Sequence, residues 1–164
     1  MRAESGGAVS NGAASDERAA LPAADGVLLW SMRAWVLARC REEDLRVEER
    51  IEAALAGLDA AEAGCGLCGF MDAVERGGTR PVTVERMCAR RLTADERTLL
   101  GVFARVQAGR TAEAARALRD MVAPASLGAA LERAADVALA LAGAGHALGA
   151  DPAPASRRAG ARWH

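Results

Sequence analysis

Residues 64–69, Gly-Cys-Gly-Leu-Cys-Gly, carry the strongest chemical signals in this chain of 164 residues. The hexapeptide fits two motifs at once, the G-x-G-x-x-G turn of dinucleotide sites and the C-x-x-C pair of redox and metal sites. Each motif has a function only in a suitable structural setting. The neighbouring sequence therefore decides which chemistry, if any, is present.

A dinucleotide site needs the glycine turn at the end of a buried parallel strand. The sequence after the motif fits in part, because a helical stretch over 70–76 is followed by strand-like residues 81–84 and by Glu85, near the expected place of a ribose-binding acid. The sequence before the motif, residues 57–63, favours a helix. We therefore expect no nucleotide cofactor.

The cysteines suggest thiol or metal chemistry. A redox pair would place Cys65 at a helix N-terminus, usually after a strand of a thioredoxin-like sheet. A metal site would add Cys88 to Cys65 and Cys68, but structural zinc takes four ligands. The sequence next to Cys88 offers no fourth donor, so Cys40 or His146 would have to come from a remote helix. Cys65, Cys68 and Cys88 are the candidate ligands for zinc or iron.

A structural interpretation explains the same residues without chemistry. A helix over 47–61 carries apolar residues at steps of four and three, and these steps continue to Cys65 and Cys68. Both cysteines are then small core residues that point inward. A second apolar stripe, Leu67, Phe70, Met71 and Val74, predicts a bend or break near the three glycines. Those glycines would let another helix approach closely, and we prefer this interpretation.

Acid–base and nucleophilic sites lack their usual residues. The histidines are His146 and the terminal His164, and the context of His146 favours a role at a helix C-terminus. The carboxylates alternate with arginines, as on a solvated helix face. We therefore expect a protein without catalytic activity.

The charge pattern bears on nucleic acid and membrane partners. The 21 basic and 22 acidic residues give a net charge of −1, which supplies no overall attraction to either. Helices after Thr93 could imitate a helix-turn-helix, but residues 112–121 contain no Asn or Gln to read bases. The longest uncharged stretch, 137–150, is shorter than the roughly 20 residues of a membrane span. We expect neither nucleic acid nor membrane as a partner, and a cytoplasmic location because the N-terminus lacks an apolar signal segment.

The predicted domain is all-α, a single small bundle of about five to six helices with short connections. Residues 27–40 form a nearly continuous apolar helix, and residues 80–87 an extended connector. Thr93 and Glu96 form a capping box that starts the next helix. Thr111 is the predicted N-cap of a short helix that includes Met121 and Val122 and ends at Pro124, and a last helix covers about 126–148.

The domain organisation and function follow from these patterns. We predict an all-α domain over 24–148, a disordered tail over 1–23 and a disordered Arg- and Pro-containing tail over 149–164. The leading prediction is a small cytoplasmic protein of interaction or regulatory type, without cofactor, that binds a protein partner or itself. The alternative is a redox-responsive protein that binds zinc or iron through Cys65, Cys68 and Cys88.

Overall fold

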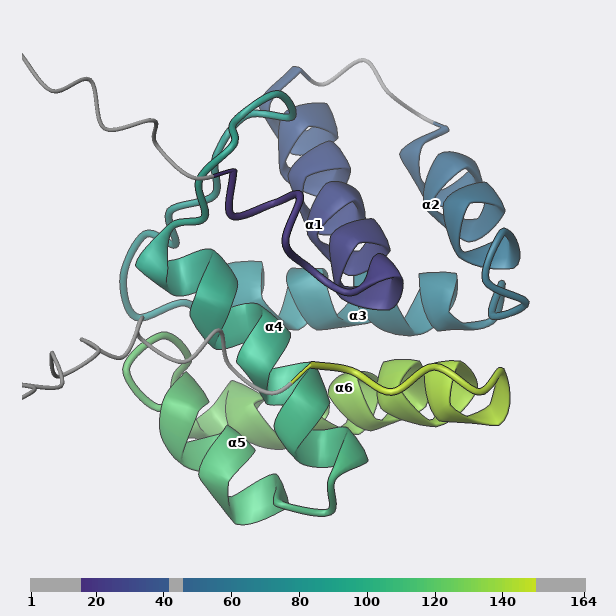
Figure 1. The fold of residues 1–164 in the computed structure, drawn as a ribbon. Coiled ribbons are helices and arrows are strands. Elements are labelled where there is room, and N and C mark those ends of the chain that lie inside the picture. Colours follow the sequence, from purple (N-terminus) through teal and green to yellow (C-terminus); the bar gives the residue numbers. More distant parts are fainter. Residues whose placement is uncertain (1–15, 42–45, 150–164) are drawn as a thin grey trace, which may run out of the picture.

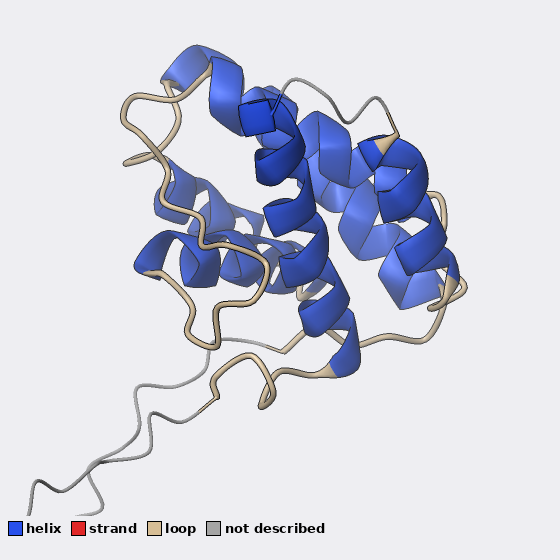
Figure 2. Cartoon of the chain, turned by 90° about the horizontal axis from the view of Figure 1, so that it is seen from above, coloured by secondary structure: helices blue, strands red, loops and turns tan. Residues whose placement is uncertain are grey.

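The computed structural model describes residues 16–41 and 46–149. Within these ranges the chain forms helices joined by loops, without a strand, as Figure 2 shows. The predicted fold class, a small all-α bundle, is therefore confirmed, although the connection between the third and fourth helices is long. The six helices of the described ranges are α1 (Ala23–Arg41), α2 (Val47–Ala56), α3 (Ala63–Arg76), α4 (Ala94–Gln107), α5 (Thr111–Leu118) and α6 (Pro124–Gly143) (Figure 1).

The centre of the bundle is the pair formed by α3 and α6, the most extensive helix–helix contact (Figure 1). Glycines on α3 permit this close approach, because a Cβ atom on Gly66 would lie 3.1 Å from Cγ2 of Val137. A Cβ atom on Gly69 would lie 2.9 Å from Cδ of Arg133. The predicted function of these glycines in helix packing is confirmed. Helices α1 and α2 contact α3, while α4 and α5 contact α6.

The break between α2 and α3 lies upstream of the predicted place. Helix α2 ends at Ala56, so the predicted continuous helix from 47 to the cysteines is wrong. Asp59 adopts a left-handed conformation, with φ of 56°. The Ala60 N–H donates to the Leu55 carbonyl at 3.1 Å and the Asp59 N–H to the Ala56 carbonyl at 3.0 Å, which are the two hydrogen bonds of a Schellman motif. Aspartate occupies the position where glycine is usual, which hides this helix end in the sequence.

The second half of the chain confirms one predicted helix boundary and corrects three, one of which is the end of the last helix, predicted at about 148 and observed at Gly143. Thr93 caps α4 in the predicted capping box. Thr111, the predicted N-cap, is instead the first residue of α5. The N-cap is Arg110, which makes no side-chain capping hydrogen bond. Pro124 begins α6 instead of ending the preceding helix, because the first turn of a helix needs no N–H from its first residue. Helix α5 already ends at Leu118.

The core is built from Leu, Val, Met and Ala side chains, with the rings of Phe70 and Phe103 in contact at a centroid distance of 4.7 Å. Trp35 is buried and Trp30 is half-buried. Met121 and Val122 are buried as predicted, although they lie in the turn after α5. The core is therefore mainly aliphatic, as the composition of the chain requires.

Both ends of the described chain lie against the domain. Residues 16–22, which belong to the predicted N-terminal tail, include Glu17, whose carboxylate pairs with Arg97 at 2.6 Å and accepts from the Leu92 N–H at 3.0 Å. At the other end, the Gly149 N–H donates to Oδ2 of Asp25 at 3.0 Å, and burial raises the pKa of Asp25. The rest of the predicted tails, 1–15 and 150–164, lies outside the described residues.

Candidate functional site

The connector between α3 and α4, residues 77–93, is held by two neighbouring carboxylates in the first turn of α4. Oδ2 of Asp95 accepts from the Thr83 N–H at 2.7 Å. Oε1 of Glu96 accepts from the Glu85 N–H at 3.1 Å. Residues 81–86 between and around these bonds contain no turn or bend. The extended connector predicted over 80–87 is thus observed over 81–86, where the alternate amides of Thr83 and Glu85 donate to α4.

A buried ion pair joins α1 to α4. Nε of Arg33 donates to Oε1 of Glu96 at 2.7 Å, and the two side chains are 1% and 0% exposed. The same arginine donates through Nη1 to the Ala89 carbonyl at 2.8 Å and through Nη2 to the Arg91 carbonyl at 2.9 Å. Oε2 of Glu96 completes the capping box by accepting from the Thr93 N–H at 2.9 Å. This network is structural, because its hydrogen bonds join elements of the fold to one another.

A second ion pair fixes the start of the connector. The guanidinium of Arg80 donates to both oxygens of Asp95, at 2.9 and 2.7 Å. Its hydrogen bonds hold the pKa of Asp95 below the usual value for aspartate. Bidentate pairs of this kind add geometric specificity to charge attraction. The connector is therefore attached to α4 through its backbone and through a side chain.

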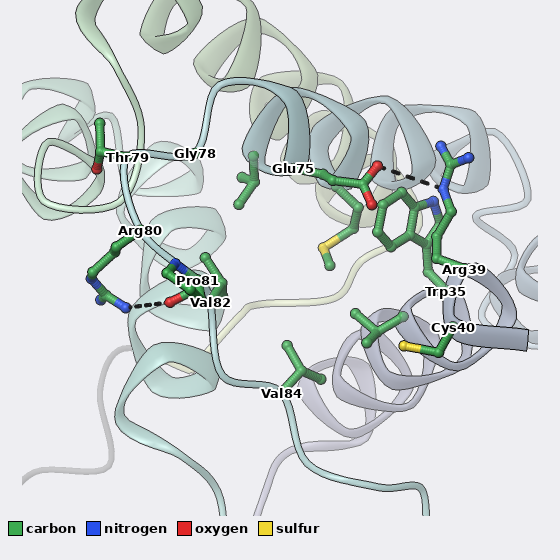
Figure 3. A pocket seen from close by; sticks show the side chains of 13 residues that line it. Trp35, Arg39, Cys40, Glu75, Gly78, Thr79, Arg80, Pro81, Val82 and Val84 are labelled. Carbon is green, nitrogen blue, oxygen red and sulfur yellow. Dashed lines mark hydrogen bonds and ion pairs between the residues drawn. The ribbon is translucent and has the colours of Figure 1, made fainter.

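A groove lies between α1, α3 and the connector, with a volume of about 540 Å³ (Figure 3). Trp35 and Cys40 of α1 face Val82 and Val84 of the connector across it. Volumes of this size and mainly apolar linings are typical of ligand sites. The apolar side chains that line the groove are Trp35, Val36, Met71, Val74, Pro81, Val82 and Val84.

The charged residues of the groove are paired with one another or with neighbours. Arg39 pairs with Asp72, and its Nε lies 3.7 Å from Oε2 of Glu75, so that the side chain bridges α1 and α3 (Figure 3). The guanidinium carbon of Arg39 lies 4.8 Å from the centre of the Trp35 ring, a cation–π contact. The remaining lining arginine, Arg80, pairs with an aspartate of α4. The groove consequently has polar boundaries but no uncompensated arginine.

The three cysteines predicted as metal ligands differ in their exposure to solvent. Cys68 is buried, and burial raises the pKa of its thiol to about 12. Cys65 is exposed, so the prediction that both cysteines point inward is wrong for Cys65. Its direction follows from the new start of α3 at Ala63, which resets the helical register. Cys88 is exposed on the connector.

No metal-binding cluster is present among the residues that the structure describes. In these residues, no group of three or more His, Cys, Asp or Glu side chains is placed to hold an ion, and Cys65, Cys68 and Cys88 therefore form no such group. Zinc or iron binding through these cysteines stays a prediction. The glycine motif of residues 64–69 lies inside α3 and follows a turn, so it lacks the strand that a nucleotide site requires.

His146 lies just beyond α6 and is used in packing. Its Nε2 lies 3.1 Å from the Leu58 carbonyl, in the turn between α2 and α3. The Gln107 side chain donates to the His146 carbonyl at 2.9 Å and accepts from the Leu148 N–H at 2.7 Å. These hydrogen bonds attach the segment after α6 to the turn between α2 and α3 and to the end of α4.

Sequence reasoning missed the groove and the ion pair beneath the connector. One signal for the ion pair was present, since Arg33 is a charged residue within the apolar helix 27–40 and such a residue needs a partner when buried. The groove had no comparable signal, because its walls come from three separate segments.

The comparisons with known proteins return no relative. No family model, no curated protein and no solved structure matches the chain. Among the described helices, none has both the length and the apolar character needed to cross a bilayer.

Proposed function

We propose that this chain is a non-enzymatic binding protein of interaction or regulatory type, whose groove receives an apolar segment of a protein partner. The observation that carries the proposal is the open, mainly apolar groove between α1, α3 and the connector. Its walls are fixed by two helices and by a connector bonded to a third helix. A preformed concave surface of this kind lowers the ordering cost of binding.

The chemistry around the groove supports binding more than catalysis. Arg39, Glu75 and Arg80 are engaged in ion pairs. A general acid or base must reach a reacting atom directly or through one water. Side chains committed to one another instead define the boundaries of a binding surface.

Peptide selection with a thiol block tests this proposal. Peptides are selected on the protein from a phage-displayed library of random sequences, and their affinities are then measured on two alkylated variants. In C65S/C88S, a bulky maleimide modifies Cys40, which lines the groove. In C40S/C65S, the same reagent modifies Cys88, which is exposed outside it and serves as the matched control.

We expect alkylation at Cys40 to weaken peptide binding at least about tenfold and alkylation at Cys88 to leave it unchanged. Failure to select any peptide, or an equal effect of both modifications, would contradict the proposed function. Binding of an apolar dye to the groove without any peptide binding would identify a small-molecule site instead and reject the protein partner.

A further inference from the structure

The extended segment 81–86 of the connector is hydrogen-bonded along one side. The amides of Thr83 and Glu85 donate to carboxylates of α4, and the Thr83 carbonyl accepts from Oγ1 of Thr93 at 2.7 Å. Val82 and Val84 make no backbone hydrogen bond within the described part of the chain. The segment therefore has one occupied backbone edge and one open edge.

The open edge faces away from α4. Successive residues of an extended chain direct their N–H and C=O groups to opposite sides. Because Thr83 and Glu85 direct theirs to α4, Val82 and Val84 direct theirs to the other side. Figure 3 shows the groove between the connector and α1, with the side chains of both valines in its lining. Backbone donors and acceptors thus border an apolar surface.

We infer that the partner segment binds as an extended strand, which pairs with the backbone of Val82 and Val84 and places alternate side chains on the apolar lining. This inference rests on the proposed function of the groove. Strand addition to an exposed edge obtains affinity from main-chain hydrogen bonds and specificity from alternate side chains. Here the edge belongs to a single extended segment that α4 holds in place.

The charges of the groove define the chemistry of the bound segment. Arg39 and Arg80 already have carboxylate partners, so an acidic side chain would compete with Asp72, Glu75 or Asp95. An ionised side chain in the apolar part would lose its hydration without a partner. Charge complementarity therefore selects an uncharged segment with apolar side chains at positions i and i+2.

Amide hydrogen exchange on the full chain tests the strand mode directly. The protein is labelled with nitrogen-15 and measured by NMR, free and with the tightest peptide from the library selection. We expect exchange at Val82 and Val84 to slow at least about tenfold on binding, because their N–H groups gain partners. Exchange at Thr83 and Glu85 should change little, since these amides are bonded in the free protein.

The outcomes separate the inference from the proposed function. A peptide that is blocked by alkylation of Cys40 but leaves exchange at Val82 and Val84 unchanged would overturn the strand mode and leave the groove function standing. A helical peptide would give this result, because a helix satisfies its own backbone groups. A peptide that alkylation of Cys40 does not block would overturn the proposed function.

A pair of variants supplies an independent measurement. V84P removes an N–H that bonds to nothing within the described domain, whereas V84A shortens the same side chain and keeps the N–H. We expect V84P to bind the selected peptide at least about tenfold more weakly than V84A does. Equal affinities of the two variants would reject backbone pairing at this residue. If V84P does not fold, the exchange measurement on the unaltered chain decides.

Discussion

Replacing Arg33 by methionine should lower the free energy of unfolding by about 3–5 kcal/mol, because it leaves Glu96 as a buried carboxylate without its cation. The side chains of the pair are 1% and 0% exposed, so the rule for buried pairs applies. Two unit charges about 4 Å apart attract by about 4 kcal/mol at an effective dielectric constant of about 20, which agrees with this range. Typical domains have a total stability of about 5–15 kcal/mol.

A double-mutant cycle separates the charge interaction from the loss of packing. R33M, E96Q and R33M/E96Q are unfolded in urea and followed by circular dichroism. The double variant should be more stable than the sum of the single effects predicts, by about 2 kcal/mol, because it removes both buried charges together. The exposed pair of Arg133 and Asp136 provides the control, and D136N, which keeps the size of the side chain, should change stability by less than about 1 kcal/mol.

The reasoning would be refuted by a loss below about 1 kcal/mol in R33M, which is the range of surface pairs. It would also be refuted by additive effects in the double variant. Either result would mean that water or a rearranged connector compensates the carboxylate of Glu96, and that the pair does not hold α1 against α4.

Three further predictions concern pH, thiol reactivity and helix packing. Arg80 lowers the pKa of Asp95, so the ionised carboxylate stabilises the fold above about pH 4, and this stabilisation is lost as the pH falls below that value. Thermal unfolding of D95N should therefore depend less on pH in this acidic range than unfolding of the unaltered protein. Cys68 is buried and the pKa of its thiol is raised, so it should resist iodoacetamide while the other three thiols react. Mass spectrometry of the native and the unfolded protein measures the extent of alkylation at each cysteine. G77A should destabilise the protein, because the new Cβ would lie 2.3 Å from the Cβ of a serine in α6, whereas G128A has free space and should raise stability by up to about 1 kcal/mol in the same melting experiment.

Each of these predictions has an opposing result. Equal acid sensitivity of D95N and the unaltered protein would show that Arg80 does not stabilise the ionised carboxylate in the folded state. Rapid alkylation of all four thiols would show that the domain opens around Cys68 on the time scale of the reaction. A melting temperature of G77A equal to that of G128A would show that α6 can shift to accept the added methyl group.

The features predicted from the sequence are those fixed by neighbouring residues. Thr93 and Glu96 are three residues apart, so their capping box could be identified from the sequence alone. The end of α2 is also local, but aspartate at position 59 supplies a left-handed conformation that sequence patterns assign mainly to glycine. A residue type that only sometimes adopts this conformation gives a weak signal.

The groove and the buried ion pair depend on contacts between distant segments. Arg33 and Glu96 are 63 positions apart, and nothing near either residue specifies the other. The groove likewise requires α1 and α3 to meet at an angle that leaves room for the connector. Such geometry is set by packing of the whole core, including the glycines of α3 that fit against α6.

The carboxylates at the start of α4 order the backbone of residues 81–86 during folding, before any partner binds. Because Asp95 and Glu96 hold residues 81–86 in the folded domain, these residues lose their backbone freedom during folding. That loss amounts to about 1–2 kcal/mol for each residue, and an encounter with a partner would not incur it again. Side chains that lie outside the groove thus determine how much entropy is left to lose on binding.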